Sequence, residues 1–187
     1  LPMPMGPGND PPQPQGGADR NAVPGYAIPA VRIVRDRPAI VPYRSSAMRG
    51  LGAFTNVIAL ESLIESCAEV AGKEAISYRL EHLDDPRAVA VIETVRDMAR
   101  LQPATDGIGF GLGYARYKNS AGYLACIARV VVEDEVRVTD VWSAGDVGEA
   151  ISPDGTINQI EGGIVQAISW ALKEEVHFSG GQNLTQS

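Results

Sequence analysis

IGFGLGYARYKNSAGYLACIARVVVEDEVRVTDVW, residues 108–142, is the stretch that decides the fold class. Its first part alternates large apolar side chains with small ones at every second position, which is the period of a β-strand. Two apolar-rich runs follow, at 123–132 and 136–142, and the acidic triplet at 133–135 separates them as a hairpin turn. The stretch therefore predicts three successive strands.

Helical spacing precedes these strands. Apolar residues recur every three or four positions and stop at a glycine: Val57, Leu60, Ile64, Cys67 and Ala71, then Gly72. A short second helix is expected over 76–83. Asp85-Pro86 then supplies an N-cap acceptor and a proline at the first position of a third helix, which ends near Leu101. The sequence thus predicts three helices before the strands.

A fourth, amphipathic helix is expected after the strands, because apolar residues share one face: Ile157, Ile160, Ile164, Ala167, Ile168, Ala171 and Leu172. Helices, then strands, then another helix indicate an α+β fold of mixed strands with packed helices, without an evident internal repeat. Half of residues 1–20 are Pro or Gly, which predicts a linker or long loop. Residues 31–43 predict short edge strands, and a polar tail follows from Phe178.

Charge and composition argue against several classes of function. The net charge is -7 and the arginines are scattered, which disfavours a nucleic-acid-binding surface. No apolar run reaches the roughly 20 residues needed to cross a bilayer. Neither Cys67 nor Cys126 has a second Cys or a His at the spacing of a zinc or iron–sulfur site, so both are expected to be buried thiols. His82 and His177 lie far apart and suggest no shared catalytic role.

Two separated segments carry residues suited to a ligand. The first is YRSSAMRGLG, residues 43–52, just before the first predicted helix. Its glycines let the backbone approach a ligand closely, and N–H groups ahead of a helix can bind anionic or metal-oxo oxygens. Arg49 adds a planar guanidinium group that is always positively charged. On residue types alone, a strand-to-helix turn with a solvated arginine is the simpler interpretation.

The second segment lies around the start of the last predicted helix. It reads DVG at 146–148, ISPDG at 151–155, NQIEGG at 158–163 and WALKEE at 170–175. The amide of Gln159 offers both a donor and an acceptor, which could pair with the polar edges of a heterocycle. Taken by itself, Gln159 is an ordinary polar residue near the beginning of a helix.

Together the two segments resemble the C-terminal part of the large, molybdopterin-binding subunit of the xanthine dehydrogenase and aldehyde oxidase family of molybdenum hydroxylases. The match at 146–175 follows the family pattern in order, although Ser152 stands where the family usually has Asn. The resemblance implies one residue of the substrate pocket, Leu51. It also implies a set of cofactor-binding residues: Ala47, Met48, Arg49, Gly50 and Gln159.

The resemblance further implies a reaction and partners. Members of the family hydroxylate a carbon of an aldehyde or an N-heterocycle with a molybdenum-pterin cofactor, expected here in its cytosine dinucleotide form. The family's base, a glutamate, corresponds to a position after Ser187, so no catalytic residue and no metal ligand is assigned in this chain. The expected partners are the remaining large-subunit polypeptide, a small subunit with iron–sulfur clusters and a small-molecule substrate.

The chain is accordingly expected to be a fragment or a split subunit. Residues 21–106 would form the first part of the molybdopterin-binding region, and residues 107–187 the second part, truncated at the C-terminus. The alternative is a non-catalytic fragment or assembly module that keeps the fold without the cofactor, and an unrelated α+β binding domain is a third interpretation. The compartment stays open between the bacterial cytoplasm and the periplasm.

Overall fold

The computed structural model describes residues 17–35, 48–101, 105–179, 182–183 and 185. The chain divides into two compact units. The larger unit comprises residues 14–35 and 49–148, and the smaller comprises 1–13, 36–48 and 149–187. The sequence-based division at residues 106 and 107 stays a prediction.

Three helices open the larger unit, close to the predicted ranges: α1 (Gly52–Val70), α2 (Ala75–Glu81) and α3 (Pro86–Ala99). After α1 the chain turns at Gly72, which has a φ of 64°, a conformation that glycine adopts without a steric penalty. At α3, the side chain of Asp85 accepts a hydrogen bond of 3.0 Å from the N–H of Arg87, and Pro86 takes the first helical position. The predicted cap of the third helix is therefore confirmed.

The three predicted strands form one antiparallel sheet in the order β1-β2-β3: β1 (Ile108–Arg116), β2 (Tyr123–Val132) and β3 (Val136–Asp146). Tyr114 lies opposite Ala125, and Ile127 lies opposite Trp142. The register between β2 and β3 shifts at Arg129 and Val130. Helices packed on a meander of strands confirm the α+β class.

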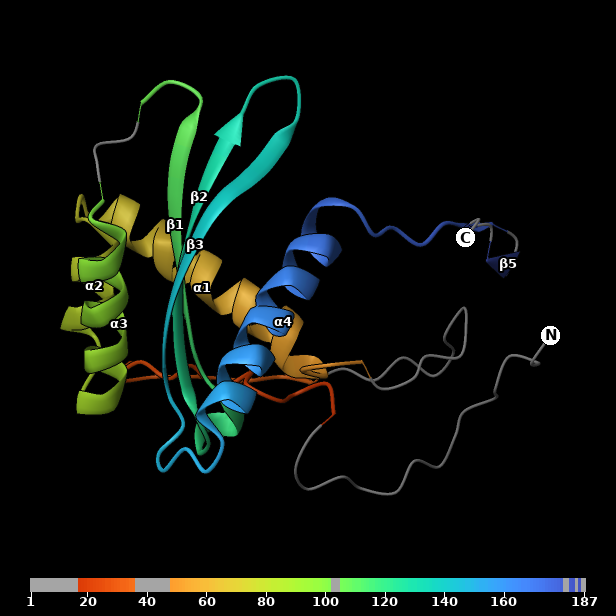
Figure 1. Cartoon of the computed structure of the whole chain (residues 1–187). Coiled ribbons are helices and arrows are strands. Elements are labelled where there is room, and N and C mark those ends of the chain that lie inside the picture. The colour runs from red at the N-terminus through yellow and green to blue at the C-terminus, as the bar shows by residue number, and fades with distance from the viewer. Residues whose placement is uncertain (1–16, 36–47, 102–104, 180–181, 184, 186–187) are drawn as a thin grey trace. The chain divides into compact units, whose positions relative to one another are not determined.

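The core of the larger unit lies between this sheet and the helices. Helix α3 packs on β2 and β3, and α1 contacts β1 (Figure 1). The buried face of α3 follows the helical period, with Ala88, Ile92 and Val95 wholly inside. The core comprises Tyr26, Ile64, Ile76, Leu83, Ala88, Val91, Ile92, Val95, Ala99, Tyr114, Tyr123, Ala125 and Ile127.

The smaller unit contains α4 (Pro153–Leu172) and a short antiparallel pair, β4 (Phe178–Ser179) with β5 (Gln182–Asn183). The predicted fourth helix is confirmed. It begins at Pro153, four residues before Ile157, the first residue of the predicted apolar face. None of the α4 side chains is buried. Ile164 and Ile168, on its apolar face, are only partly covered by the described residues.

Two expectations from the sequence are wrong. Residues 31–35 form no strand, although Val31 and Ile33 alternate with polar residues, and residues 36–43 lie outside the described part. Cys67 and Cys126 are free and half-buried rather than buried. Burial nevertheless raises the pKa of the Cys126 thiol to about 11.

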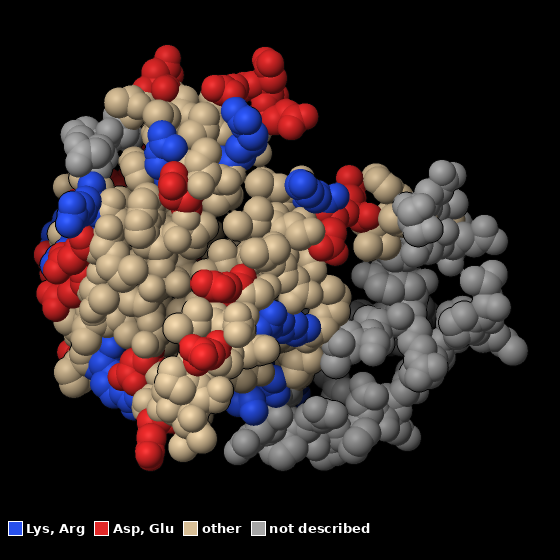
Figure 2. Space-filling view, viewed as in Figure 1, with Lys and Arg blue, Asp and Glu red and all other residues tan. Residues whose placement is uncertain are grey.

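The surface carries both signs of charge. Figure 2 shows Lys and Arg side chains interleaved with Asp and Glu over the visible face. Within the described residues, no helix combines the length and the apolar character that crossing a bilayer requires.

Candidate functional site

The turn before α1 has an unusual backbone. Gly50 has a φ of 83°, and Leu51, which precedes the first helical residue, has a φ of 54° and a ψ of -136°. A non-glycine residue in such a region costs about 1–3 kcal/mol, and it persists only where its surroundings hold it. Met48 is 60% exposed and Arg49 is also exposed, while Leu51 is partly buried. Ala47 lies outside the described residues.

The segment at 17–20 holds the first turn of α1 in place. Gly52 lies so close to this segment that a Cβ atom on it would be 2.4 Å from the carbonyl oxygen of Gly17 and 2.8 Å from that of Ala18. The Nδ2 of Asn56 donates to the carbonyl oxygens of Ala18, at 2.7 Å, and Arg20, at 2.9 Å. A glycine at position 52 is therefore required for this approach of two backbones.

The amino end of α1 can donate hydrogen bonds to an anion. Among the described residues, no side chain caps this helix at Leu51, and the N–H of Ala53 bonds to the carbonyl oxygen of Gly50 at 3.1 Å. The first N–H groups of a long helix carry partial positive charge and point out of its end. Together with the Arg49 guanidinium, they suit anionic oxygens such as those of a phosphate or a metal-oxo group.

Gln159 lies in the second turn of α4, and its side chain is exposed. It belongs to the smaller unit, whereas Arg49, Gly50 and Leu51 belong to the larger one. The structure thus places the three loop residues together and places Gln159 within its own unit. The assignment of all of them to a cofactor stays a proposal.

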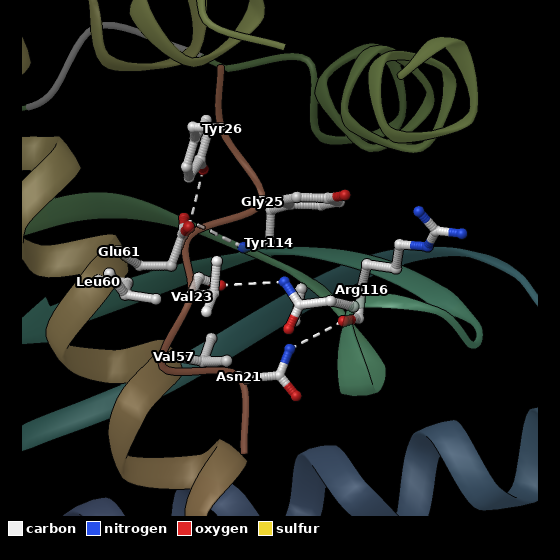
Figure 3. A pocket seen from close by; sticks show the side chains of 11 residues that line it. Asn21, Val23, Gly25, Tyr26, Val57, Leu60, Glu61, Tyr114 and Arg116 are labelled. Atoms are coloured by element: carbon white, nitrogen blue, oxygen red, sulfur yellow. Dashed lines mark hydrogen bonds between the residues drawn. The ribbon is translucent and has the colours of Figure 1, made fainter. Parts of the chain in front are cut away.

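A buried ionic network lies at the middle of α1. The Glu61 carboxylate accepts hydrogen bonds from the Tyr26 hydroxyl at 2.7 Å and from the Tyr114 N–H at 3.2 Å (Figure 3). It also accepts a hydrogen bond from the Arg79 Nε at 3.1 Å. Arg79 also donates to Glu65 at 2.8 Å. The side chain of Arg79 is 1% exposed and that of Glu61 is 10% exposed. Burial raises the pKa of Glu61, although the bonds from Tyr26 and Arg79 lower it.

Two cavities flank this network, and both are smaller than the usual pocket of a drug-sized ligand. The one in Figure 3, between the segment at 21–26, α1 and β1, has a volume of about 20 Å³, which is room for roughly one water molecule. The other has about 250 Å³ and is lined by Asp84, Asp85, Tyr114 and Arg116 among others. Pockets that bind drug-sized ligands have volumes of roughly 300–1,000 Å³. These cavities therefore do not provide an enclosed cofactor pocket.

The DVG segment at 146–148 ends the larger unit and is held by an arginine. Arg87 donates to both carboxylate oxygens of Asp146, from Nε at 2.7 Å and from Nη2 at 2.6 Å. Asp146 also accepts the N–H of Gly148 at 2.9 Å. The hydrogen bonds from Arg87 and Gly148 lower the pKa of Asp146 to about 2.

The lowered pKa of Asp146 predicts the pH range in which its carboxyl takes up a proton. Because the pKa lies below its ordinary value of 3.8, the ion pair is fully formed above that value and is lost only as the pH falls through about 2. The carbon-13 shift of the Asp146 carboxyl is expected to stay constant down to about pH 3. In Arg87→Met the same signal should begin to titrate between about pH 5 and pH 3. A wild-type carboxyl that titrates like that of the variant would contradict the observed geometry.

Comparison with known proteins identifies the fold. A family model of the molybdopterin cofactor-binding domain matches residues 25–187. The chain belongs to this family. The resemblance to molybdenum hydroxylase large subunits that the two sequence segments indicated is thereby confirmed.

Two curated proteins are similar in sequence to this molybdopterin-binding domain. A nicotinate dehydrogenase subunit of Pseudomonas putida is 36% identical over 180 residues, which cover 86% of this chain and 15% of that protein. The beta subunit of isoquinoline 1-oxidoreductase of Brevundimonas diminuta is 36% identical over 167 residues, which cover 83% of this chain and 21% of that protein. The chain thus spans less than a quarter of the length of either relative.

The residues present in the domain fit the cofactor chemically. The amides before and at the start of α1, the Arg49 guanidinium and the Gln159 amide are donors of the kind that anionic and polar pterin groups accept. Among the residues that the structure describes, no three His, Cys, Asp or Glu side chains gather as metal ligands.

Sequence reasoning missed the charged residues that organise this domain. Glu61 follows Leu60 on the apolar stripe of α1, and Arg79 lies three residues after Ile76 on the buried face of α2. A charge inside an apolar stripe is a usable signal, because buried charges are almost always paired. The pair of Arg87 and Asp146 carries no such signal, since 59 residues separate them.

Proposed function

We propose that this chain holds part of the molybdenum-pterin cofactor within the large subunit of a molybdenum-dependent oxidoreductase. The observation that carries the proposal is the turn at 48–52, where two successive positive φ angles precede a 19-residue helix whose amino end no described side chain caps. Backbone N–H groups at the amino end of a helix point toward the ligand side and attract anionic oxygens. The proposed cofactor-binding residues are Ala47, Met48, Arg49, Gly50 and Gln159.

Each residue has a separate task in this proposal. Arg49 supplies a positive charge that orients anionic groups of the cofactor, and Gly50 lets the backbone approach them closely. The Gln159 amide pairs with a polar edge of the pterin. Leu51 lines the substrate pocket and excludes water. When bound, the molybdenum cofactor supplies the oxygen-transfer and electron-transfer chemistry of the hydroxylation.

The proposed reaction is hydroxylation of a carbon in an N-heterocycle, with an aldehyde carbon as the other substrate class. The names of the two relatives, which refer to nicotinate and to isoquinoline, favour the N-heterocycle. Both relatives are named as subunits, which supports a multi-subunit enzyme. We assign the cytosine dinucleotide form of the cofactor, iron–sulfur clusters on a partner subunit, and a base from the remaining large-subunit polypeptide.

The test is the cofactor content of two variants. Arg49→Ala and Gln159→Ala, made in the complete protein that contains this chain, are expected to lower the molybdenum bound per protein by about tenfold at limiting cofactor. Elemental analysis and pterin fluorescence measure this content. Arg137→Ala is a matched control, since Arg137 is 60% exposed and pairs only with Glu133 across a hairpin turn among the described residues.

Three outcomes separate the alternatives. Loss of molybdenum in both variants, with the control unchanged and native mass showing a cysteine-rich partner, supports the proposed function. Equal molybdenum in all four proteins contradicts the residue assignment. A folded wild-type protein that holds no molybdenum when the host makes the cofactor contradicts the function itself and favours the assembly module.

A further inference from the structure

Three elements of the larger unit, α3, β1 and β2, meet around the ring of Tyr123, at the start of β2. The guanidinium of Arg87, on α3, lies 4.7 Å from the ring centre, and that of Arg116, at the end of β1, lies 4.8 Å from it. The hydroxyl of Tyr123 donates to Asp85, the N-cap of α3, at 2.7 Å. A cation over an aromatic ring is attracted by the electron density of its face. The ring thus helps to hold the Arg87 guanidinium in place.

The Arg87 guanidinium contacts Asp146, the last residue of β3. Both of its bonds to Asp146 are short, at 2.7 Å and 2.6 Å, and a two-point contact between planar groups sets orientation as well as distance. The two side chains are 47% and 35% exposed, whereas Tyr123 is 3% exposed. Exposed ion pairs contribute little to folding stability. The two-point contact between Arg87 and Asp146 therefore orients the Asp146 side chain more than it stabilises the fold.

Asp146 extends this orientation into the segment that follows. Its Oδ1 accepts the N–H of Gly148, where the chain turns with a φ of 75°. Gly148 is the last residue of the larger unit, and residue 149 begins the smaller one. The residues that follow, 149–166, include Gln159. The Arg87 fork therefore holds the last turn of the backbone before the proposed cofactor segment.

We propose that Arg87 is a positioning residue for cofactor binding: with its guanidinium over the Tyr123 ring, it fixes Asp146 and thereby the backbone turn at 146–148 that leads into the segment carrying Gln159. The inference rests on the proposed function and deepens it. Arg87 itself need not touch the cofactor. Its effect reaches the cofactor through the backbone at 146–152.

The test has one readout that needs no cofactor. In protein from a host that cannot make the pterin, hydrogen exchange at the amides of 147–152 is expected to be about tenfold faster in Arg87→Ala and in Asp146→Asn than in wild type. Arg87→Lys keeps the charge but not the planar fork, so it should restore little of the protection. The double variant should exchange no faster than either single variant, because both remove the same contact.

The second readout is the cofactor content of protein from a competent host. Molybdenum per protein is expected to fall about tenfold in Arg87→Ala, with a melting temperature within about 4 °C of wild type. Arg129→Ala is the matched control. Arg129 also joins β2 to β3, through Thr139 at 2.8 Å and Asp140 at 3.4 Å, but six or seven residues before Asp146 in β3.

Each outcome decides the proposal. Faster exchange at 147–152 together with lost molybdenum, neither seen in Arg129→Ala, supports it. Unchanged exchange in Arg87→Ala overturns it, whatever the cofactor content. Faster exchange with full molybdenum content also overturns it, because the turn would then be ordered by Arg87 without serving the cofactor. Absence of molybdenum from the wild type overturns the proposed function, and the role of Arg87 toward the cofactor fails with it.

Discussion

Replacement of Arg79 by Met is expected to lower the free energy of unfolding by about 3–5 kcal/mol. Met matches the length of the aliphatic part of the side chain, so the change removes charge and hydrogen bonds more than volume. It leaves the carboxylate of Glu61, whose side chain is 10% exposed, buried without its cation. Because a whole domain is stable by only about 5–15 kcal/mol, a loss of this size is a large fraction of the total.

Urea unfolding followed by fluorescence measures the effect of Arg79→Met, since Trp142 packs against the core of the larger unit. Arg137→Met, at an exposed arginine, should change the unfolding free energy by about 0.5 kcal/mol or less. The double variant Glu61→Gln with Arg79→Met should recover part of the loss, because a neutral amide can accept from the Tyr114 N–H through its oxygen and donate to the Tyr26 hydroxyl through its NH2 group. If Arg79→Met unfolds within about 1 kcal/mol of wild type, the network does not stabilise the fold as described.

Gly52→Ala has the second-largest expected effect, a loss of about 3 kcal/mol. The new Cβ would lie 2.4 Å from the carbonyl oxygen of Gly17 and 2.9 Å from the carbonyl carbon of Ala18. Both are backbone atoms, so no side-chain rotation relieves the contact, and the segment at 17–20 must separate from α1. That separation also removes the support of the strained turn at Leu51, so cofactor content should fall in the same variant.

The matched control for Gly52→Ala is Gly111→Ala. Gly111 lies in β1, and a Cβ built there meets no atom within 4 Å. Its unfolding free energy should stay within about 0.5 kcal/mol of wild type. Limited proteolysis before residue 26 reports directly on the detached segment. Equal stability and equal protease resistance of the two variants would show that the approach of the two backbones is not required.

Local pattern was enough to predict most elements of the fold. The period-two stretch at 108–114 became β1, and the Asp85-Pro86 signal became the cap of α3. Both follow from neighbouring residues. The expected strand in residues 31–35 failed because alternation alone does not provide a partner strand, and these residues pair with none.

Less of the candidate site than of the fold could be predicted from the sequence. Residues 48–51 are neighbours in the sequence, so they lie together in any fold. The close approach of Gly52, just after the strained Leu51, to a segment more than thirty residues earlier cannot be read from the local sequence. The Glu61 network joins the segment at 21–26 with two helices and a strand. Such contacts depend on how elements pack, which no local pattern specifies.

The half-buried thiol of Cys126 also has a chemical consequence. With a pKa of about 11, only about one thiol in ten thousand is ionised near neutral pH. The thiolate is the form that peroxide and other oxidants attack first, so this cysteine is spared the first step toward sulfenic acid. A domain that binds a molybdenum cofactor can therefore carry this sulfur in its central strand without creating a competing target for oxidants.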